Sequence, residues 1–454
     1  MGNLLTSLLN TANGLSVLTQ GLNVTENNVV NANTPGYVKQ TQVFEAQPFD
    51  LSIGLPGGVT AGPMISSRDA FAEQTVREQQ SAANYYAPQA SVLTALQGNF
   101  DLSSSTSVAS SLNSFFQSFS QLSVNPSDTV SRQAVLDQAG QLARSFQQTA
   151  SGLAQQGSDT GGQITSTVND INSLASTIAQ INAEGRVDPN GGVDAGVDAK
   201  LNSSLESLSQ LAGITVLQQT NGQVNVYLGG QTPLVIGNQA YAIQNDFSTP
   251  QTTILDATGK DVTSQVTAGQ LGGLLIVKNN SIPSYLADLN TLAQNVADQV
   301  NTALNAGIDA NGAAPVTDLF TYDAANGTAA TMAVNAMTPD QIAAALPGSA
   351  GGNGNALALA ALGSSQNING YTYAQFYGNL AARVGRDSST ATDSQNTQQD
   401  LLAQAQNTRS QESSVSLDEE ATHLIAFQRA YQATSKLLTV LDDITNTLIN
   451  IIPQ

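Results

Sequence analysis

The stretch SLDEEATHLIAFQRAYQATSKLLTVLDDITNTLINII, residues 416–452, has the pattern of one long amphipathic helix. Its first residues form a capping box, in which Ser416 is expected to accept the amide hydrogen of Glu419. Apolar side chains then recur at alternating intervals of three and four residues, which places them on one face of the helix. This stripe consists of Leu424, Phe427, Tyr431, Leu438, Leu441, Leu448 and Ile452. At 1.5 Å per residue the helix is about 54 Å long.

The N-terminal residues repeat this spacing. Their stripe consists of Leu4, Leu8, Leu15, Leu18, Leu22 and Val29, and Thr11 and Thr25 occupy the two remaining positions. About three to four heptads of such spacing are typical of a coiled coil, although a plain amphipathic helix produces nearly the same pattern. An amphipathic helix has to bury its apolar stripe, and the other end of the chain is the obvious partner. The sequence therefore predicts that the two ends pair as an α-helical coiled coil.

Each terminal helix also carries a second apolar edge. This edge is formed by Leu5, Leu9, Leu437, Ile444 and Ile451. A single pair of helices would leave such edges uncovered, whereas the packing of many copies in a ring or a head-to-tail array would bury them. The alternative is that both helices close the protein's own core.

The N-terminal helix is predicted to stop abruptly within NNVVNANTPGYVKQ, residues 27–40. Its apolar stripe ends at Val29 or Val30, and Asn residues that tolerate the left-handed backbone at a helix end follow, Asn31 and Asn33 among them. The dipeptide Pro35-Gly36 fits the two central positions of a type II turn. We therefore predict a hinge that consists of Asn28, Asn31, Asn33, Thr34, Pro35, Gly36 and Tyr37.

Between the two ends, helical patterns give way to strands and then return. Helices are predicted at residues 83–99, 108–122, 129–156, 164–183, 200–211, 282–304 and 371–411. Ser127 or Asp128 is expected to cap the third of them. Alternation of apolar and polar residues around Asn221-Gly222 indicates a β-hairpin, and strand-like runs continue to about residue 277. The predicted fold is mainly α, with a β-containing lobe inserted into a long helical rod that both halves of the chain build.

These patterns divide the chain into three predicted domains, as expected for 454 residues. The predicted domains are a terminal coiled-coil domain (1–38 and 415–454), a helical rod (39–212 and 365–414) and a β-rich outer lobe (213–364) with one long helix at 282–304.

The composition excludes several classes of function. The chain has 34 acidic and 14 basic residues, and a net charge of −20 argues against binding to nucleic acid or to an anionic membrane. The absence of Cys removes disulfides, thiolate catalysis and Cys-containing metal sites. No apolar stretch approaches the roughly 18 residues of a membrane-spanning helix. The first basic residue is Lys39, so the N-terminus lacks the positive region of a cleaved secretory signal.

The sequence offers little for catalysis. His423 is the single His, and no Cys exists to join it, so a surface or interface role is favoured. Asp188, Asn190 and Asp194 alternate as in a calcium loop, but the required Gly and closing Glu are missing, which favours a solvated turn. We predict that the protein is not an enzyme and binds no cofactor or metal.

Several segments resemble a known family. Residues 23–40, NVTENNVVNANTPGYVKQ, are similar to the N-terminal signature of the axial proteins of the bacterial flagellum, which form its rod, hook and hook–filament junction. Residues 415–451 are similar to the C-terminal signature of the same family. The interior blocks at 122–146, 211–235 and 269–304 resemble the hook-associated protein 1 branch, whose members form the first junction layer between hook and filament.

The resemblance implies a structural protein that leaves the cell unfolded through the flagellar type III apparatus and self-assembles at the hook tip. Its implied partners are copies of itself, the hook protein, the filament-side junction protein and an export chaperone on the C-terminal helix. Its implied location is extracellular, at the hook–filament junction. Residues 192–208 and 328–365 depart from the family pattern. The alternatives are another axial protein (filament-side junction, hook or distal rod protein), or an exported enzyme or adhesin whose active part is the lobe.

Overall fold

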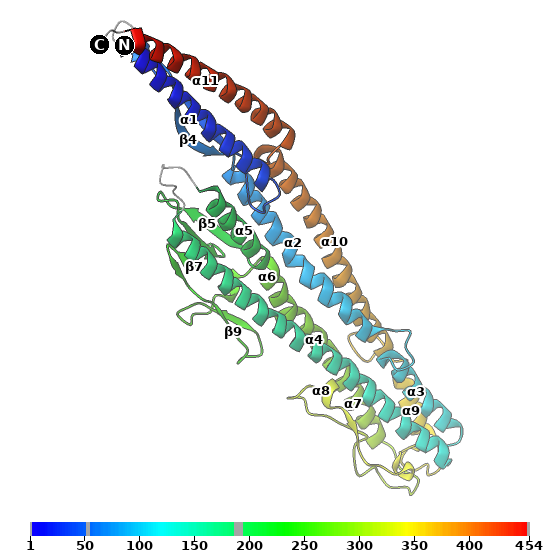
Figure 1. Ribbon diagram of the computed structural model, residues 1–454. Helices are drawn as coiled ribbons and strands as arrows, with labels where there is room; N and C mark the ends of the chain where they lie inside the picture. Colours follow the sequence, from blue (N-terminus) through cyan, green and yellow to red (C-terminus); the bar gives the residue numbers. More distant parts are fainter. Residues whose placement is uncertain (1, 51–54, 186–193, 452–454) are drawn as a thin grey trace.

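The computed structural model of the chain describes residues 2–50, 55–185 and 194–451. The molecule is elongated, and its first and last helices point to the same tip (Figure 1). Below them, a body of long helices carries small sheets on one side. The predicted class, mainly α with a β-containing lobe, is confirmed.

The two terminal helices lie side by side. They are α1, Gly2–Asn31, and α11, Leu417–Ile451, and they form an arm that extends beyond the body (Figure 1). Their association follows from the apolar stripe that each carries. The supercoiled geometry of a coiled coil stays a prediction.

A β-hairpin lies against α1. Strands β1 (Gln40–Ala46) and β4 (Val59–Ser66) pair antiparallel, and β2 (Phe49–Asp50) pairs with β3 (Leu55–Pro56) farther along the same hairpin. The sequence predicts no strand here, because these residues fall in the range assigned to the helical rod. A bulge between Gln42 and Phe44 shifts the register, so the period of two that would identify a strand is interrupted.

Four long helices form most of the body. They are α2 (Ala70–Gln97), α3 (Val108–Val124), α4 (Thr129–Glu184) and α10 (Tyr373–Ser413), and α10 packs along α2. Side-chain caps begin each of them, and Asp128 caps α4 by accepting the amides of Val130 and Ser131. Helix α4 runs unbroken for 56 residues, so the two helices predicted at 129–156 and 164–183 are one. Packing at both of its ends outweighs the low helix propensity of the glycines between them.

The β-lobe begins with α5, Ala195–Leu211. An antiparallel sheet follows, with β5 (Ile214–Gln218), β6 (Val224–Leu228), β7 (Thr232–Ile236) and β8 (Gln239–Ala240) in sequential order. Strands β9 (Gln244–Asp246) and β10 (Thr253–Leu255) form a separate pair. The hairpin predicted at Asn221-Gly222 joins β5 to β6, and Gly222 has a φ of 83°.

After the lobe the chain returns to helix, which corrects the prediction of strand-like runs up to residue 277. Helix α6 (Gly269–Ile276), a π-helical turn (Val277–Ser281) and α7 (Ile282–Asn305) follow one another. Buried helices and buried strands have the same short apolar runs, which explains the error. The remaining short elements are β11 (Phe320–Thr321), α8 (Thr328–Thr331), β12 (Ala333–Val334), α9 (Gly354–Leu362) and 3-10 turns at Gly98–Phe100, Thr263–Gln265 and Pro339–Gln341.

Two hydrophobic cores stabilise the body. The lower core draws on residues 90–153 and 277–391, and the upper core on residues 164–275. The helix predicted at 282–304 is present as α7, but it packs in the lower helical core instead of the β-lobe. Helix α7 packs there against α4, α8, α9 and α10. The predicted domain boundaries at 213 and 364 stay a prediction.

Candidate functional site

The predicted stripe of α11 faces inward over most of its length. Leu424, Phe427, Leu438 and Leu441 are half-buried, whereas Tyr431 and Leu448 are 37% and 44% exposed. Ile452 lies outside the described residues.

From residue 17 onward the buried face of α1 lies about one position away from the predicted stripe, except at Thr25, which belongs to both. Leu4, Leu8, Leu15, Leu18 and Leu22 are half-buried and Val29 is 39% exposed, whereas Val17, Gly21, Thr25 and Asn28 are buried. Gly21 explains the shift, because a Cβ there would lie 3.0 Å from the ring of Phe44 and 3.1 Å from that of Phe427. These two rings meet edge to face at 5.8 Å. A search for apolar residues overlooks a helix face that is centred on Gly, Thr and Asn.

The second apolar edge remains uncovered on both terminal helices. Leu5, Leu9, Leu437 and Ile444 are between 43% and 61% exposed, and so is Val440, which lies on the same side of α11 as Leu437 and Ile444. We call these five side chains the terminal apolar face. Surfaces of this kind on an otherwise well-packed protein mark interaction sites.

Asn28 connects the base of the arm to its surroundings and is buried. Its Nδ2 donates to the carbonyl oxygen of Gln40 at 2.8 Å and to Oε2 of Glu420 at 3.0 Å. Its Oδ1 accepts the Gln40 amide and the Tyr37 hydroxyl, both at 2.9 Å. One amide side chain thus joins α1, the turn after it, β1 and α11.

Charged groups close this base from the side of α11. Lys39 Nζ donates to Oε2 of Glu419 at 2.8 Å and lies 3.6 Å from Oε1 of the buried Glu420. The hydrogen bond from Lys39 lowers the pKa of Glu419. The Glu419 amide donates to Oγ of Ser416 at 3.4 Å, as the predicted cap requires, while the Glu419 carboxylate accepts from Lys39.

The turn at residues 34–37 has the predicted chain reversal. The Tyr37 amide donates to the Thr34 carbonyl at 3.1 Å, and Gly36 has a φ of 74°, as position three of a type II turn requires. The left-handed backbone expected at Asn31 and Asn33 does not occur, because Asn369 is the only non-glycine residue with positive φ in the described chain. Instead, the Asn31 side chain donates to the Asn27 carbonyl one turn earlier, which lets α1 end with ordinary helical geometry.

The turn is packed tightly against the body. A Cβ on Gly36 would lie 2.3 Å from the carbonyl oxygen of Ala199 in α5, so only glycine fits there. Arg68 holds the turn from the other side, since its Nη2 donates to the Gly36 carbonyl at 2.6 Å. The same guanidinium contacts Oδ2 of Asp198 at 2.7 Å and Oε1 of Glu73, and both carboxylates are buried.

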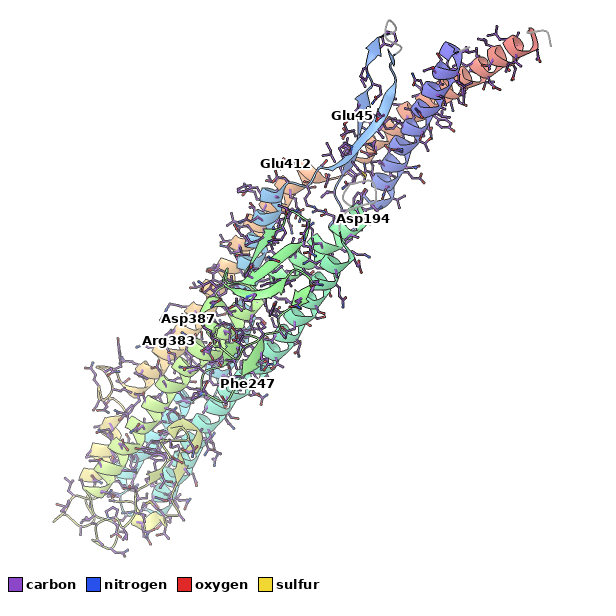
Figure 2. All side chains as sticks on the ribbon, turned by 90° about the vertical axis from the view of Figure 1, so that its left-hand side faces the viewer. Glu45, Asp194, Phe247, Arg383, Asp387 and Glu412 are labelled. Atoms are coloured by element: carbon purple, nitrogen blue, oxygen red, sulfur yellow. The ribbon has the colours of Figure 1, made fainter. Side chains whose placement is uncertain are left out.

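Arg409 extends this ion-pair network to α10. Its Nη1 lies 3.2 Å from Oε2 of Glu73 and 2.9 Å from Oε2 of Glu206. The network therefore links the turn to α2, α5 and α10, and we call it the arm joint, made of Gly36, Arg68, Glu73, Asp198, Glu206 and Arg409. Nothing in the sequence pattern indicates it, because its members are far apart in the chain. Figure 2 shows Asp194 and Glu412 at this level, where the body meets the hairpin.

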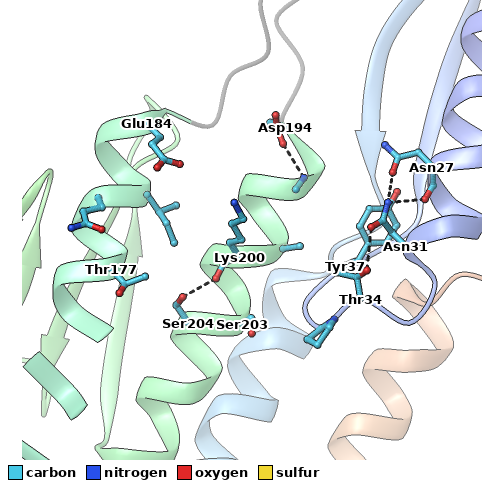
Figure 3. Close-up of a pocket in the computed structure, with 15 residues that line it drawn as sticks. Asn27, Asn31, Thr34, Tyr37, Thr177, Glu184, Asp194, Lys200, Ser203 and Ser204 are labelled. Carbon is cyan, nitrogen blue, oxygen red and sulfur yellow. Dashed lines mark hydrogen bonds between the residues drawn. The ribbon is translucent and has the colours of Figure 1, made fainter. Parts of the chain in front are cut away.

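A groove of about 840 Å³ lies beside the turn and next to the ends of α4 and α5 (Figure 3). Asn27, Asn31, Thr34 and Tyr37 lie on one wall, and Glu184 and Lys200 on the other. Asp194 caps α5 by accepting the amides of Gly196 and Val197. The solvated turn expected at residues 188–194 stays a prediction. Asp188 and Asn190 lie outside the described residues.

The described residues contain no group of three His, Cys, Asp or Glu side chains that could hold a metal ion. His423 is exposed on α11 and its ring meets that of Phe427 at 6.3 Å, with Glu419 one turn earlier. The prediction that the protein is not an enzyme stays a prediction. In the same part of the chain, every helix is too short or too polar to span a bilayer.

Tyr37 makes the base of the arm sensitive to alkali. Burial, with a smaller effect from Glu420, raises the pKa of Tyr37 to about 12. The unfolded phenol ionises near pH 10, so the stabilisation is complete below about pH 10 and is lost as the pH rises toward 12. We expect the melting temperature to fall as the pH rises from about 10 toward about 12, and to fall less in Tyr37→Phe. Tyr241→Phe is the control, because the hydrogen bond of the Tyr241 hydroxyl is exposed. An equal fall of the melting temperature in wild type, Tyr37→Phe and Tyr241→Phe would contradict the assignment of this alkaline sensitivity to Tyr37.

Comparisons with known proteins agree with this architecture. Residues 93–320, half of the chain, match the model of the flagellar hook-associated protein FlgK helical domain. Residues 406–451, which include α11, match the C-terminal model of the flagellar basal body rod FlgEFG proteins.

Relatives and a solved structure extend the match. Flagellar hook-associated protein 1 of Bacillus subtilis is 26% identical over 487 aligned positions, which cover 96% of each chain. The Escherichia coli protein of the same name is 27% identical over 68% of this chain and 59% of its own length. The flagellar hook junction protein FlgK from Burkholderia pseudomallei shares the fold, with a TM-score of 0.66 and 17% identity over 74% of this chain and 99% of that one. The chain therefore belongs to the family of flagellar hook-associated protein FlgK.

Proposed function

We propose that the chain is a structural subunit that self-assembles at the hook–filament junction of the bacterial flagellum. The observation that carries this proposal is the arm, which extends beyond a well-packed body and leaves the terminal apolar face uncovered. Burial of apolar surface is the main driving force of association, so neighbouring copies that cover this face would stabilise one another. Copies of the chain, the hook protein and the filament-side junction protein are the proposed partners.

The arm is poorly suited to closing a core of its own. Its helices pack on each other and α1 packs on the hairpin, whereas the two large cores lie in the body. Leu5 and Leu9 near one end of the pair, and Leu437 and Ile444 on the other helix, are exposed in the single chain. This favours assembly over the alternative that the helices complete the monomer.

Export would come before assembly. We propose that the chain leaves the cell through the flagellar type III apparatus and becomes extracellular at the junction. A chaperone that holds α11 would cover Leu437, Val440 and Ile444 until export, since these side chains are exposed in the free protein.

Another axial role is the second candidate. The C-terminal match alone would allow a rod or hook protein, because that model describes rod proteins. The helical-domain match over residues 93–320 supports the hook-associated role instead.

The test is complementation of a bacterium that lacks its own copy of this gene, with wild type and Leu437→Asp/Ile444→Asp. The wild type should restore filaments. The double variant should lower the number of filamented cells at least about tenfold and release unpolymerised filament protein, because two charges would enter an apolar contact.

Val130→Asp is the matched control, since Val130 is 77% exposed on the body. It should support normal filaments, and both variants should melt within about 2 °C of wild type because the changed positions are exposed. Normal filaments with the double variant, or an equal defect with Val130→Asp, would refute the proposal.

A further inference from the structure

The two cores of the body meet partway along α4, in a segment where this helix buries no large apolar side chain. Residues up to Leu153 belong to the lower core, and those from Ile164 onward belong to the upper core. Between them, α4 buries only Gly157, Thr160 and Gly161. The helix therefore offers no large apolar side chain in the turns that connect the cores.

The backbone of α4 is also weak at this level. Residues 157–162 read GSDTGG, and glycine in a helix interior is less favourable than any other residue except proline. A Cβ on Gly157 or Gly161 would have no neighbour nearer than 3.6 Å, and one on Gly162 none within 4 Å. Close packing therefore does not require glycine at these three positions.

The neighbouring helices are irregular at nearly the same level. A π-helical turn, Val277–Ser281, joins α6 to α7, and Lys278 Nζ from this turn donates to the Gly157 carbonyl at 2.8 Å. Such turns interrupt the regular hydrogen-bond ladder of a helix. The glycine-rich segment of α4 and the π-helical turn between α6 and α7 thus lie against each other.

Two further helices are weakened close by. Pro88 lies inside α2 and cannot donate to the carbonyl four residues earlier. Helix α6 touches α2 here, since a Cβ on Gly273 would lie 2.1 Å from the carbonyl oxygen of Tyr85. In α10, no residue between Ala391 and Ala405 is buried.

Polar contacts join the π-helical turn to α4 and to the β-lobe at this level. Besides the Lys278 bond, the Asn279 side chain accepts the Thr252 amide and donates to the Thr252 carbonyl, both at 2.8 Å. The half-exposed Phe247, labelled on the body in Figure 2, lies over Gly161.

We propose that the body bends at this level. The mid-body hinge consists of residues 154–163 of α4 and residues 277–281. The hydrogen bond from Lys278 to the Gly157 carbonyl favours the straight form of the body. Bending there moves the lower end of the body while the arm and the β-lobe keep their contacts. The hinge is a property of the single chain and does not depend on the proposed function.

Hydrogen exchange of the full-length protein tests the hinge directly. The amides of residues 156–164 should exchange at least about tenfold faster than those of residues 139–150 in the same helix, because local opening exposes them. Equal protection along α4 would overturn the proposal.

Matched substitutions distinguish local opening at the hinge from a general loosening of helix α4. Gly157→Ala/Gly161→Ala should slow exchange at residues 156–164 by about tenfold or more, because both changes favour helix and fit the space available. Lys278→Met should accelerate exchange at the same amides. Gly140→Ala, in the lower part of α4, should leave them unchanged, and an effect of Gly140→Ala equal to that of the double variant would overturn the assignment.

A distance measurement tests the motion itself, and the absence of native Cys makes labelling specific. Spin labels at Val130→Cys and Gln239→Cys span the hinge, whereas Val130→Cys and Leu357→Cys both lie below it. The pair that spans the hinge should give the broader distance distribution. The double substitution Gly157→Ala/Gly161→Ala should reduce the width of that distribution about twofold. Equally narrow distributions for the two pairs in the wild type would refute bending.

Discussion

Replacement of Asn28 by Ala is expected to release the base of the arm from the turn and the hairpin. The change removes the partner of four polar groups, namely the Gln40 amide and carbonyl, the Tyr37 hydroxyl and the Glu420 carboxylate. Each buried group that loses its partner costs about 1–3 kcal/mol, so a total of roughly 3–5 kcal/mol remains even if some groups reach water. Exchange of the amides in residues 20–31 and 40–46 should accelerate about 100-fold to 4000-fold.

Asn27→Ala is the control for this prediction. Asn27 precedes Asn28 in the chain but is exposed, and its side chain accepts a hydrogen bond from Asn31 one turn later in the same helix. In Asn27→Ala, the exchange rates of the amides in residues 20–31 and 40–46 should stay within about threefold of wild type. The assignment of Asn28 as the connector fails if both variants behave alike.

Replacement of Arg68 by Met should destabilise the arm joint and the upper body with it. The guanidinium contacts Asp198 and Glu73, which are 3% and 5% exposed. Removal of one partner from a buried ion pair costs about 3–5 kcal/mol, because the remaining charge stays buried. Arg409 still pairs with Glu73, so the loss should lie at the lower end of this range.

Thermal unfolding followed by circular dichroism measures this loss. At about 2–4 °C per kcal/mol for a unit of this size, the transition of the upper body should fall by roughly 6–12 °C. Arg144→Met is the matched control, since Arg144 is exposed on α4 and its guanidinium donates a hydrogen bond to Gln141 in the same helix. A shift below about 2 °C in Arg68→Met would show that the network contributes little.

The sequence specifies the terminal helices because their information is local. Amphipathic spacing identifies α1 and α11, Ser416 and Glu419 mark the start of α11, and Pro35-Gly36 marks the turn. Each of these signals depends on residues within one or two helical turns, so no knowledge of distant partners is needed.

Errors arise where tertiary packing overrides local preference. The glycines at 157–162 predict a break, yet α4 continues because both flanking segments are anchored in cores. The buried face of α1 passes through Gly21 and Asn28, whose roles depend on the Phe427 ring and on Gln40. A search for apolar residues cannot find such a face.

The sequence by itself determines the helical class, the pairing partners at the two ends and the place of the turn, because hydrophobic periodicity and turn chemistry are properties of neighbouring residues. Only the tertiary structure decides that Arg68 meets Asp198, that Arg409 meets Glu206 and that Lys278 meets Gly157. These contacts join residues 121 to 203 positions apart in the chain. Local periodicity carries no information about such separations, so the arm joint and the mid-body hinge exist only once the helices have packed.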